Sequence, residues 1–343
     1  MRILVVSTAL FMCPPPGYAG LELVAFNVAK YLAKKGHKVT LLSVEGSKGD
    51  GFDVIANVKG GHHDPEGEMF NPIIPRVKNG EWDIIIDHSW QCLPYSLKKD
   101  MPSLKMMHVC HGMLPYASPP PVDKPCFVGV SKWHAGFLSQ HLHIPVEVAY
   151  NGVDVETLPL ITEKEDYAVF WARIMHDKGV LETIHIMKEW IAKGYISKGI
   201  VAGEDRFVTD PGYVLEVIRQ CDGRKIVFMG SLPRVMMPDV LGKAKVLLAP
   251  VNEPYREIFN LSLIEAAAMG TPTFTTDKGA AVELVTPETG MVFQRWEDMV
   301  DAFSLLEHTS PEACRKQAEE FGIEPMSARY EELILKVMEK GGW

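Results

Sequence analysis

The stretch Glu257-Ile-Phe-Asn-Leu-Ser-Leu-Ile-Glu265, followed by Ala-Ala-Ala-Met-Gly270-Thr-Pro272, is the most informative part of this 343-residue chain. It places seven mostly apolar residues between two carboxylates. An acid at each end of an apolar run is unusual, because a buried carboxylate needs a partner or a ligand hydroxyl. Alanines favour helix, and Gly270 with Pro272 ends it. We therefore expect a loop that becomes a helix near residue 259, with Glu257 just before the first turn and Glu265 inside it.

Two interpretations fit this local pattern. The free amides of a first helical turn attract an anion such as a diphosphate. Two helical turns span about 12 Å, roughly the distance from a sugar to a ribose across two phosphates. A nucleotide sugar fits such a site. The alternative is an ordinary amphipathic helix whose two acids both face solvent, and the spacing alone favours this alternative.

The rest of the chain alternates apolar strand patterns with helical patterns. A strand at 2–8, a glycine-bearing loop, a helix at 21–35 and a strand at 38–44 form one βαβ unit. Further strands are predicted at 52–57, 82–87, 104–110, 126–130 and 146–150, with helices between most of them. After a polar linker at 156–166, strands are predicted at 167–171, 199–202, 225–229, 246–249, 273–275 and 290–293.

The helices predicted after the linker lie at 178–193, 211–221, 235–243, 259–269, 279–285, 296–307, 311–321 and 326–340. Two successive α/β halves indicate two Rossmann-like, doubly wound domains that face a cleft. The expected boundaries are 1–154 for the first domain and 155–324 for the second.

Composition narrows the class of protein. The apolar fraction of 47% and the charged fraction of 23% are typical of a soluble globular protein. No run of about 20 apolar residues predicts a transmembrane segment. The N-terminus enters a strand pattern directly and lacks a signal-peptide cleavage site, so we expect a cytoplasmic protein. Six cysteines without a CxxC pair indicate reduced thiols.

Charge argues against nucleic acid as a partner, because the net charge is −9. The charge is uneven: residues 1–150 hold 14 basic and 13 acidic residues, and residues 151–343 hold 21 and 31. A peripheral membrane contact of the first half therefore stays open, although no strongly basic stripe supports one.

Candidate ligand-binding residues follow the predicted strands, since ligands of such sheets sit outside the carboxyl ends of the strands. Arg173 and Lys178 follow the strand at 167–171, and two cations at this position can clamp a diphosphate; a pair of surface charges is the alternative. Gly17 and Gly20 follow the first strand and let backbone approach an anion. The GxGxxG fingerprint is absent, which disfavours NAD.

Neither a metal nor a cofactor is indicated. His111 follows the strand at 104–110, but a lone loop histidine is more often structural than catalytic. No H-x3-H or cysteine cluster supports zinc. No Asp-x-Asp pair is present to hold a divalent ion on a diphosphate. We therefore expect a metal-independent protein whose nucleotide-linked ligand is a substrate.

Taken together, these motifs resemble the retaining nucleotide-sugar glycosyltransferases of the GT-B fold, the large family 4-like group marked by an E-x7-E motif. Glu257 to Glu265 with Gly270-Thr-Pro272 matches that motif. The resemblance continues in order through Pro16-Gly17-Tyr-Ala-Gly20-Leu-Glu22, Lys35-Gly-His-Lys-Val, Asp87-His-Ser-Trp90, His108-Val-Cys-His111-Gly112, Val130-Ser131, Asn151-Gly-Val-Asp154, Arg173 with Lys178-Gly179, and Gly279-Ala-Ala-Val-Glu283 with Thr289-Gly290.

The resemblance implies a role for each matching residue. Gly20 and its neighbours approach the donor phosphates, and Arg173 and Lys178 bind the diphosphate. Glu257 binds sugar hydroxyls and Glu265 the ribose hydroxyls. The amides of Phe259, Asn260 and Leu261 touch sugar or phosphate, and His111 sits by the reacting sugar. The resemblance also implies that the C-terminal helix, at 325–343, packs back on the first domain, which holds the acceptor.

Several positions depart from the family pattern. The usual glycine after the motif's phenylalanine is Asn260, whose side chain would clash with the donor sugar or hydrogen-bond to it. The usual glycines before Arg173 and Gly20 are Ala172 and Ala19, and Ala280 with Ala281 follows Gly279. These changes affect the shape of the donor pocket and spare every charged group.

The leading hypothesis is a retaining, metal-independent transfer of a hexose from a UDP-, GDP- or ADP-linked donor to a hydroxyl. The acceptor, whether carbohydrate, lipid-linked or a small molecule, is not readable from the sequence. A nucleotide-sugar epimerase or a sugar phosphorylase of the same fold is the first alternative. A non-catalytic glycan- or nucleotide-binding relative is the second.

Overall fold

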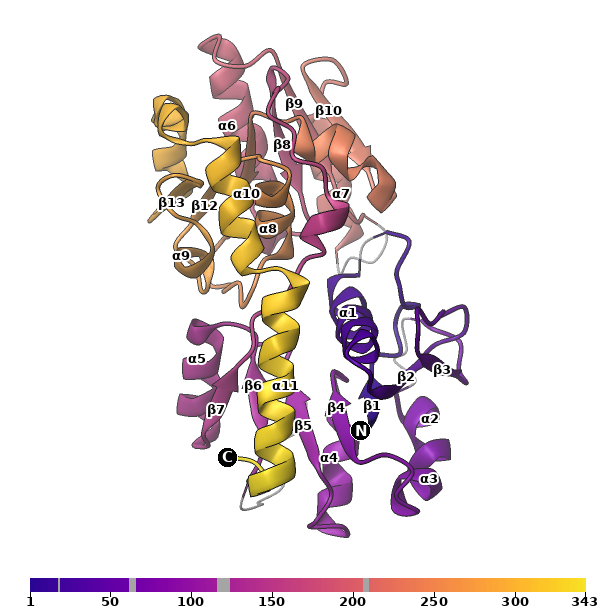
Figure 1. Ribbon diagram of the computed structural model, residues 1–343. Coiled ribbons are helices and arrows are strands. Elements are labelled where there is room, and N and C mark those ends of the chain that lie inside the picture. Colours follow the sequence, from indigo (N-terminus) through magenta and orange to yellow (C-terminus); the bar gives the residue numbers. More distant parts are fainter. Residues whose placement is uncertain (18, 62–65, 116–123, 206–209) are drawn as a thin grey trace. The chain divides into compact units, whose positions relative to one another are not determined.

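The computed structural model describes residues 1–17, 19–61, 66–115, 124–205 and 210–343. The chain folds into two compact units. The first contains Met1–Pro15, Ala19–Gly152 and Ile323–Trp343, and the second contains Pro16–Tyr18 and Val153–Gly322. Each unit holds one parallel sheet with helices against it (Figure 1).

The first unit is built on a seven-stranded sheet of order β3-β2-β1-β4-β5-β6-β7. Valine and isoleucine dominate β1 and β4 at the centre of the sheet, which are buried apart from Arg2, as expected for a parallel sheet covered on both faces. The chain turns from one side of the sheet to the other between β1 and β4. The strands are β1 (Arg2–Val6), β2 (Lys38–Ser43), β3 (Asp53–Ala56), β4 (Ile84–Asp87), β5 (Met106–Val109), β6 (Phe127–Gly129) and β7 (Val146–Val148).

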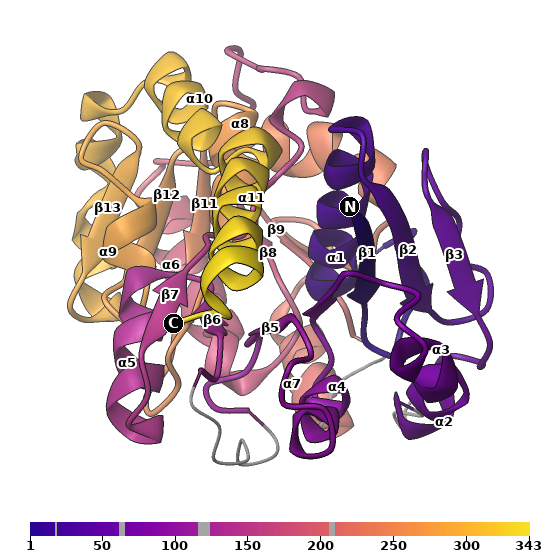
Figure 2. The same ribbon diagram turned by 60° about the horizontal axis from the view of Figure 1, so that its bottom comes forward.

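Helices from both ends of the chain cover this sheet. The longest are α1 (Gly20–Lys34), α5 (Lys132–Leu142) and α11 (Ile323–Lys340), and the short ones are α2 (Glu66–Phe70), α3 (Ile74–Lys78) and α4 (Leu93–Ser96). The C-terminal α11 packs beside α1 (Figure 2). It buries a stripe at helical spacing, formed by Met326, Tyr330, Leu333, Ile334 and Val337.

The second unit has a six-stranded parallel sheet of order β10-β9-β8-β11-β12-β13. Its strands are β8 (Tyr167–Trp171), β9 (Lys198–Ala202), β10 (Ile226–Gly230), β11 (Val246–Ala249), β12 (Thr273–Thr276) and β13 (Gly290–Phe293). Its α-helices are α6 (Val180–Ala192), α7 (Pro211–Gln220), α8 (Leu261–Ala268), α9 (Ala281–Leu284) and α10 (Pro311–Glu320). Trp190 of α6 is fully buried and meets Phe274 of β12 edge-on, with ring centroids 6.0 Å apart. The chain changes direction across the sheet between β8 and β11.

The predicted α/β class, with two doubly wound parallel sheets, is confirmed, but two predicted helices are wrong. Residues 235–243 form a 3₁₀ turn (Arg234–Met236) and then a π-helix (Pro238–Gly242), because Pro238 has no N–H to continue an α-helical ladder. Residues 296–307 form two 3₁₀ helices, Trp296–Asp301 and Phe303–His308, which meet at Ala302.

Two further expectations from the sequence concern membrane spans and thiols. In the part of the chain that the structure describes, no helix combines the length and apolar character needed to cross a membrane. The six cysteines are all free.

Candidate functional site

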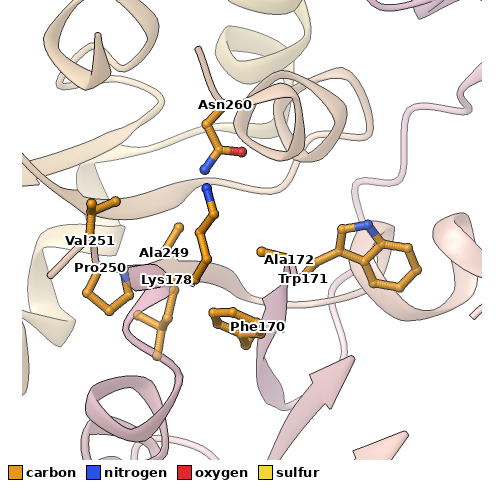
Figure 3. Close-up of a pocket in the computed structure, with 9 residues that line it drawn as sticks. Phe170, Trp171, Ala172, Lys178, Ala249, Pro250, Val251 and Asn260 are labelled. Atoms are coloured by element: carbon orange, nitrogen blue, oxygen red, sulfur yellow. The ribbon is translucent and has the colours of Figure 1, made fainter. Parts of the chain in front are cut away.

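A pocket lies in the second unit at the carboxyl ends of β8 and β11, where the sheet changes direction (Figure 3). Parallel sheets place ligands at this point, because no helix crosses over the two strand ends there. The pocket is lined by Phe170, Trp171, Ala172, Lys178, Leu248, Ala249, Pro250, Val251 and Asn260. Two of the predicted site residues, Lys178 and Asn260, therefore share one pocket.

Lys178 reaches the pocket from a short 3₁₀ turn, His176–Lys178, rather than from the helix predicted to begin there. Gly179 interrupts the helix because its φ is +65°, which a side chain rarely adopts. A Cβ at Gly179 would also lie 2.5 Å from the carbonyl oxygen of Pro250. The close approach of this turn to the end of β11 holds Lys178 at the pocket.

Lys178 forms an ion pair with Glu257, and the two side chains are only 11% and 10% exposed. The amino group also lies 4.9 Å from the centroid of the Tyr255 ring, within the range of a cation–π contact. Burial lowers the pKa of Lys178, and the charge of Arg173 acts in the same direction. The charges of Glu257 and Tyr255 and the hydrogen bond to Glu257 outweigh these effects, so the pKa of Lys178 lies above its ordinary value. Lys178 is therefore a fixed positive charge in a nearly dry site.

Glu257 is positioned through its backbone. Its N–H donates to the carbonyl of Lys278 at 3.0 Å, and its own carbonyl accepts from Ala280 N–H at 2.8 Å. Between these two bonds Gly279 has a φ of +94°, and a Cβ there would lie 2.3 Å from the Glu257 oxygen. Only glycine permits this close pairing, which explains the glycine after β12.

Asn260 begins α8 as its N-cap. Its Oδ1 accepts a hydrogen bond from Ser262 N–H at 3.0 Å, so the amide oxygen is used within the helix end. The amide nitrogen then faces the pocket on the side of Lys178 (Figure 3). Phe259 packs its ring against Phe321, with centroids 6.0 Å apart, and Leu261 is the first residue of α8.

Glu265, inside α8, is held by a residue that the sequence analysis missed. Arg234 donates to Glu265 Oε1 at 2.6 Å. Arg234 lies in the 3₁₀ turn that follows β10, and a cation shortly after a predicted strand was the only available signal. The alternative in which both motif acids face solvent is wrong: Glu257 is 8% exposed and Glu265 is 3% exposed.

Two predicted residues, Gly20 and His111, belong to the first unit. Gly20 is the first residue of α1. His111 lies beyond β5, and its Nε2 is 2.8 Å from Nδ1 of His88, which directly follows β4. The backbone N–H of His88 donates to the carbonyl of Val6 at 2.8 Å, so His88 lies between β1 and β4, where the first sheet changes direction. Arg173, in the second unit, lies two residues beyond β8.

A buried polar chain next to these histidines was also missed. His108 Nδ1 lies 2.8 Å from Asp87 Oδ2, and His108 Nε2 lies 3.1 Å from Cys92 Sγ. The donor atoms of these three residues lie within 4.8 Å of one another, the only such group of three or more among the described residues. Asp87 and Cys92 already occupy both nitrogens of His108.

Family models match both units of the chain. The model described as Glycosyltransferase Family 4 matches residues 18–157, and the model described as Glycosyl transferases group 1 matches residues 165–308. The chain is similar in fold to AviGT4, a glycosyltransferase involved in avilamycin A biosynthesis, with a TM-score of 0.77, 21% identity and 98% coverage of both chains. The chain is a family 4-like glycosyltransferase of the GT-B fold.

Other solved structures share the fold of this glycosyltransferase. Sucrose-phosphate synthase from Thermosynechococcus elongatus has a TM-score of 0.77 and 15% identity, and the match covers 99% of this chain and 100% of that one. HepE from Anabaena, in complex with UDP-glucose, has a TM-score of 0.72 and 15% identity, with 98% and 100% coverage. No curated protein matches the glycosyltransferase.

Proposed function

We propose that this glycosyltransferase moves a hexose from a nucleoside-diphosphate sugar to an acceptor hydroxyl, with retention of configuration and without a metal ion. The observation that carries the proposal is that each buried carboxylate of the E-x7-E motif forms an ion pair. Lys178 holds Glu257, and Arg234 holds Glu265. A buried ion pair is costly, so a site that keeps the Lys178–Glu257 pair at a pocket is better explained by binding than by stability.

The two acids suit hydroxyl groups, and the cations suit phosphates. On this proposal Glu257 binds sugar hydroxyls and Glu265 the ribose hydroxyls. Arg173 and Lys178 bind the diphosphate, together with backbone amides at Phe259, Asn260 and Leu261. Gly20 and His111 contribute from the first unit, at the phosphates and the reacting sugar.

The chemistry follows from these charges. The bond between the anomeric carbon and the diphosphate breaks, and its electron pair leaves with the phosphate. Lys178 and Arg173 stabilise the charge that develops there, which is the type of interaction that usually contributes most to catalysis. The acceptor oxygen attacks from the same face, and its proton passes to the departing phosphate oxygen. No step in this sequence requires a metal ion.

The proposal is tested by a ligand screen with UDP-, GDP- and ADP-hexoses. UDP-glucose comes first, because HepE, which shares this fold, was crystallised with it. A donor at 100 times its Kd should stabilise the fold by about 2.7 kcal/mol and raise its melting temperature. The matching nucleoside monophosphate is the control, since it lacks the second phosphate.

Donors that stabilise the protein are then tested for transfer over a panel of sugar and lipid-linked acceptors. The expected product has the anomeric configuration of the donor, and its rate of formation is unchanged by EDTA. Sugar transfer to inorganic phosphate in place of an acceptor would favour a phosphorylase. Donor binding without turnover on any acceptor would favour a non-catalytic binding protein.

A further inference from the structure

Two histidines share a hydrogen bond at the strand ends of the first unit. His88 Nδ1 lies 2.8 Å from His111 Nε2, and their rings stack with centroids 5.1 Å apart. A neutral imidazole has one N–H and one bare nitrogen, so one of these residues donates and the other accepts. The choice decides which nitrogen of His111 carries its proton.

Both rings are neutral. Burial and then the charge of His108 lower the pKa of His88 to about 3. Burial, followed by the charges of His88, His108 and His134, lowers the pKa of His111 well below its ordinary value. Asp87 and Cys92 raise the pKa of His108 against the effect of burial, so a proton is more favourable on His108 than on either of the two stacked rings. A positive charge beside the two rings disfavours a second one.

The surroundings of His88 decide the direction of the bond. His88 is fully buried, and its Nε2 has no hydrogen-bond partner among the residues that the structure describes. The Tyr330 ring of α11 lies over the imidazole at 6.1 Å and only 16° from parallel. An N–H in the plane of His88 therefore does not point at the face of the Tyr330 ring, and among the described residues the Tyr330 hydroxyl makes no hydrogen bond to Nε2 either.

The two directions then have different energies. If His111 donated to His88, the proton of His88 would sit on Nε2 as a buried N–H without an acceptor. Such orphaned donors are rare in folded proteins, and buried acceptors without a partner are less so. If His88 donates from Nδ1, its Nε2 is a bare acceptor and no buried N–H is left unbonded.

We propose that His88 is a positioning residue that donates from Nδ1 to Nε2 of His111 and so fixes the proton of His111 on Nδ1. His111 then presents a neutral N–H to a ligand and is a hydrogen-bond donor, not a general base. The identity of the ligand that accepts this hydrogen bond rests on the proposed function, in which His111 lies by the reacting sugar. The tautomer itself does not depend on that function.

The tautomer is measured on the full-length protein labelled with ¹⁵N-histidine. Two-bond ¹H–¹⁵N correlation spectra separate protonated from bare ring nitrogens, and the variants His111→Gln and His88→Phe assign the signals. In the wild type we expect His111 protonated at Nδ1 and bare at Nε2. His111 protonated at Nε2 would overturn the proposal, whether or not any donor is turned over.

Two variants of His88 separate positioning from packing. His88→Phe keeps a ring against Tyr330 and removes the donor, so His111 should shift toward the Nε2-protonated form. His88→Asn keeps an N–H near the position of Nδ1 and should restore the wild-type tautomer. An unchanged His111 spectrum in His88→Phe would contradict the proposal.

Activity gives a second readout once a donor is found. His88→Phe should lower kcat about tenfold, equivalent to about 1.4 kcal/mol, with little change in donor KM. His88→Asn should recover most of this loss. His141 of α5 is exposed and bonds only within its helix, to the Phe137 carbonyl at 2.8 Å, so His141→Phe is the matched control and should leave kcat unchanged. Equal losses in His88→Phe and His88→Asn would sink the positioning role.

Discussion

Replacing both members of the Lys178–Glu257 pair should separate stability from turnover. Each side chain is about nine-tenths buried. Lys178→Met alone leaves an uncompensated carboxylate in this site, and Glu257→Gln alone leaves an uncompensated ammonium group. Breaking a buried pair in this way costs about 3–5 kcal/mol of unfolding free energy. The double variant leaves no charge behind, so most of the stability should return.

Turnover should follow a different pattern. If Lys178 stabilises the departing diphosphate, the double variant still lacks that cation and should lose about 10²–10³ in kcat, as when one preorganised donor is removed from an anion-stabilising site. Urea unfolding gives the stability of each variant, and initial rates of sugar transfer give kcat. A double variant that regains both stability and turnover would refute the assigned role.

Lys164 provides the matched control for this experiment. It is a half-buried lysine of the same unit, and its amino group donates to Gly242 O at 2.7 Å, Met269 O at 3.1 Å and Thr271 Oγ1 at 3.0 Å. It precedes β8, whereas Lys178 follows it, so the two lysines lie at opposite ends of that strand. Lys164→Met should therefore lower stability with little loss of kcat.

Three further predictions use the same assays. Gly279→Ala places a Cβ 2.3 Å from the backbone oxygen of Glu257, at a φ of +94°. It should therefore lower the free energy of unfolding by about 1–3 kcal/mol and abolish the donor-induced rise in melting temperature. The control is Gly136→Ala inside α5, where a Cβ meets nothing within 4 Å, and it should have neither effect. Glu265→Gln should weaken donor binding about tenfold in calorimetry, the effect of one charge-assisted hydrogen bond, and unchanged affinity would contradict its contact with the ribose. The depressed pKa of His88 means that the unfolded chain binds a proton between about pH 6.5 and 3 that the folded protein does not, so stability falls as pH is lowered through this range. From pH 7 to pH 5 the wild type should lose about 2 kcal/mol more than His88→Phe, measured by urea unfolding at each pH.

The fold was largely predictable because its signals are local. Apolar runs with β-branched residues marked the strands, and glycines such as Gly36 and Gly270 marked the ends of helices. Both glycines have positive φ in the structure, +88° and +76°, which is the physical basis of that signal. The two wrong helices, 235–243 and 296–307, failed because apolar periodicity does not distinguish α from 3₁₀ or π geometry.

The candidate site was predictable only in part. Glu257, Glu265 and Lys178 stood out because each belongs to a motif with fixed spacing along the chain. Arg234 did not stand out, because it lies 31 residues from Glu265 in the sequence and in a different element, the 3₁₀ turn after β10. A pairing of this kind depends on how two strand ends are placed in the sheet, and no spacing in the sequence encodes it.

The histidine group illustrates the same limit more sharply. His88 follows β4, His108 lies within β5 and His111 follows β5, so their proximity could be expected from the order of a parallel sheet. Their protonation could not, since it depends on burial by α11, which lies more than 200 residues away in the sequence. The Tyr330 ring of that helix packs against His88, whose Nε2 has no hydrogen-bond partner among the described residues.

Both motif acids form ion pairs in the structure, and this affects how a donor would bind. An isolated ammonium group as buried as that of Lys178 would be costly, and Glu257 compensates its charge. A diphosphate brings its own negative charge and can replace Glu257 at Lys178 without leaving either side unpaired. Glu257 is then released to accept from sugar hydroxyls. On the proposed function, one exchange of partners at Lys178, from Glu257 to the diphosphate, thus recognises both the phosphate and the sugar. A free hexose has no negative charge to pair with Lys178, so it cannot bring about this exchange.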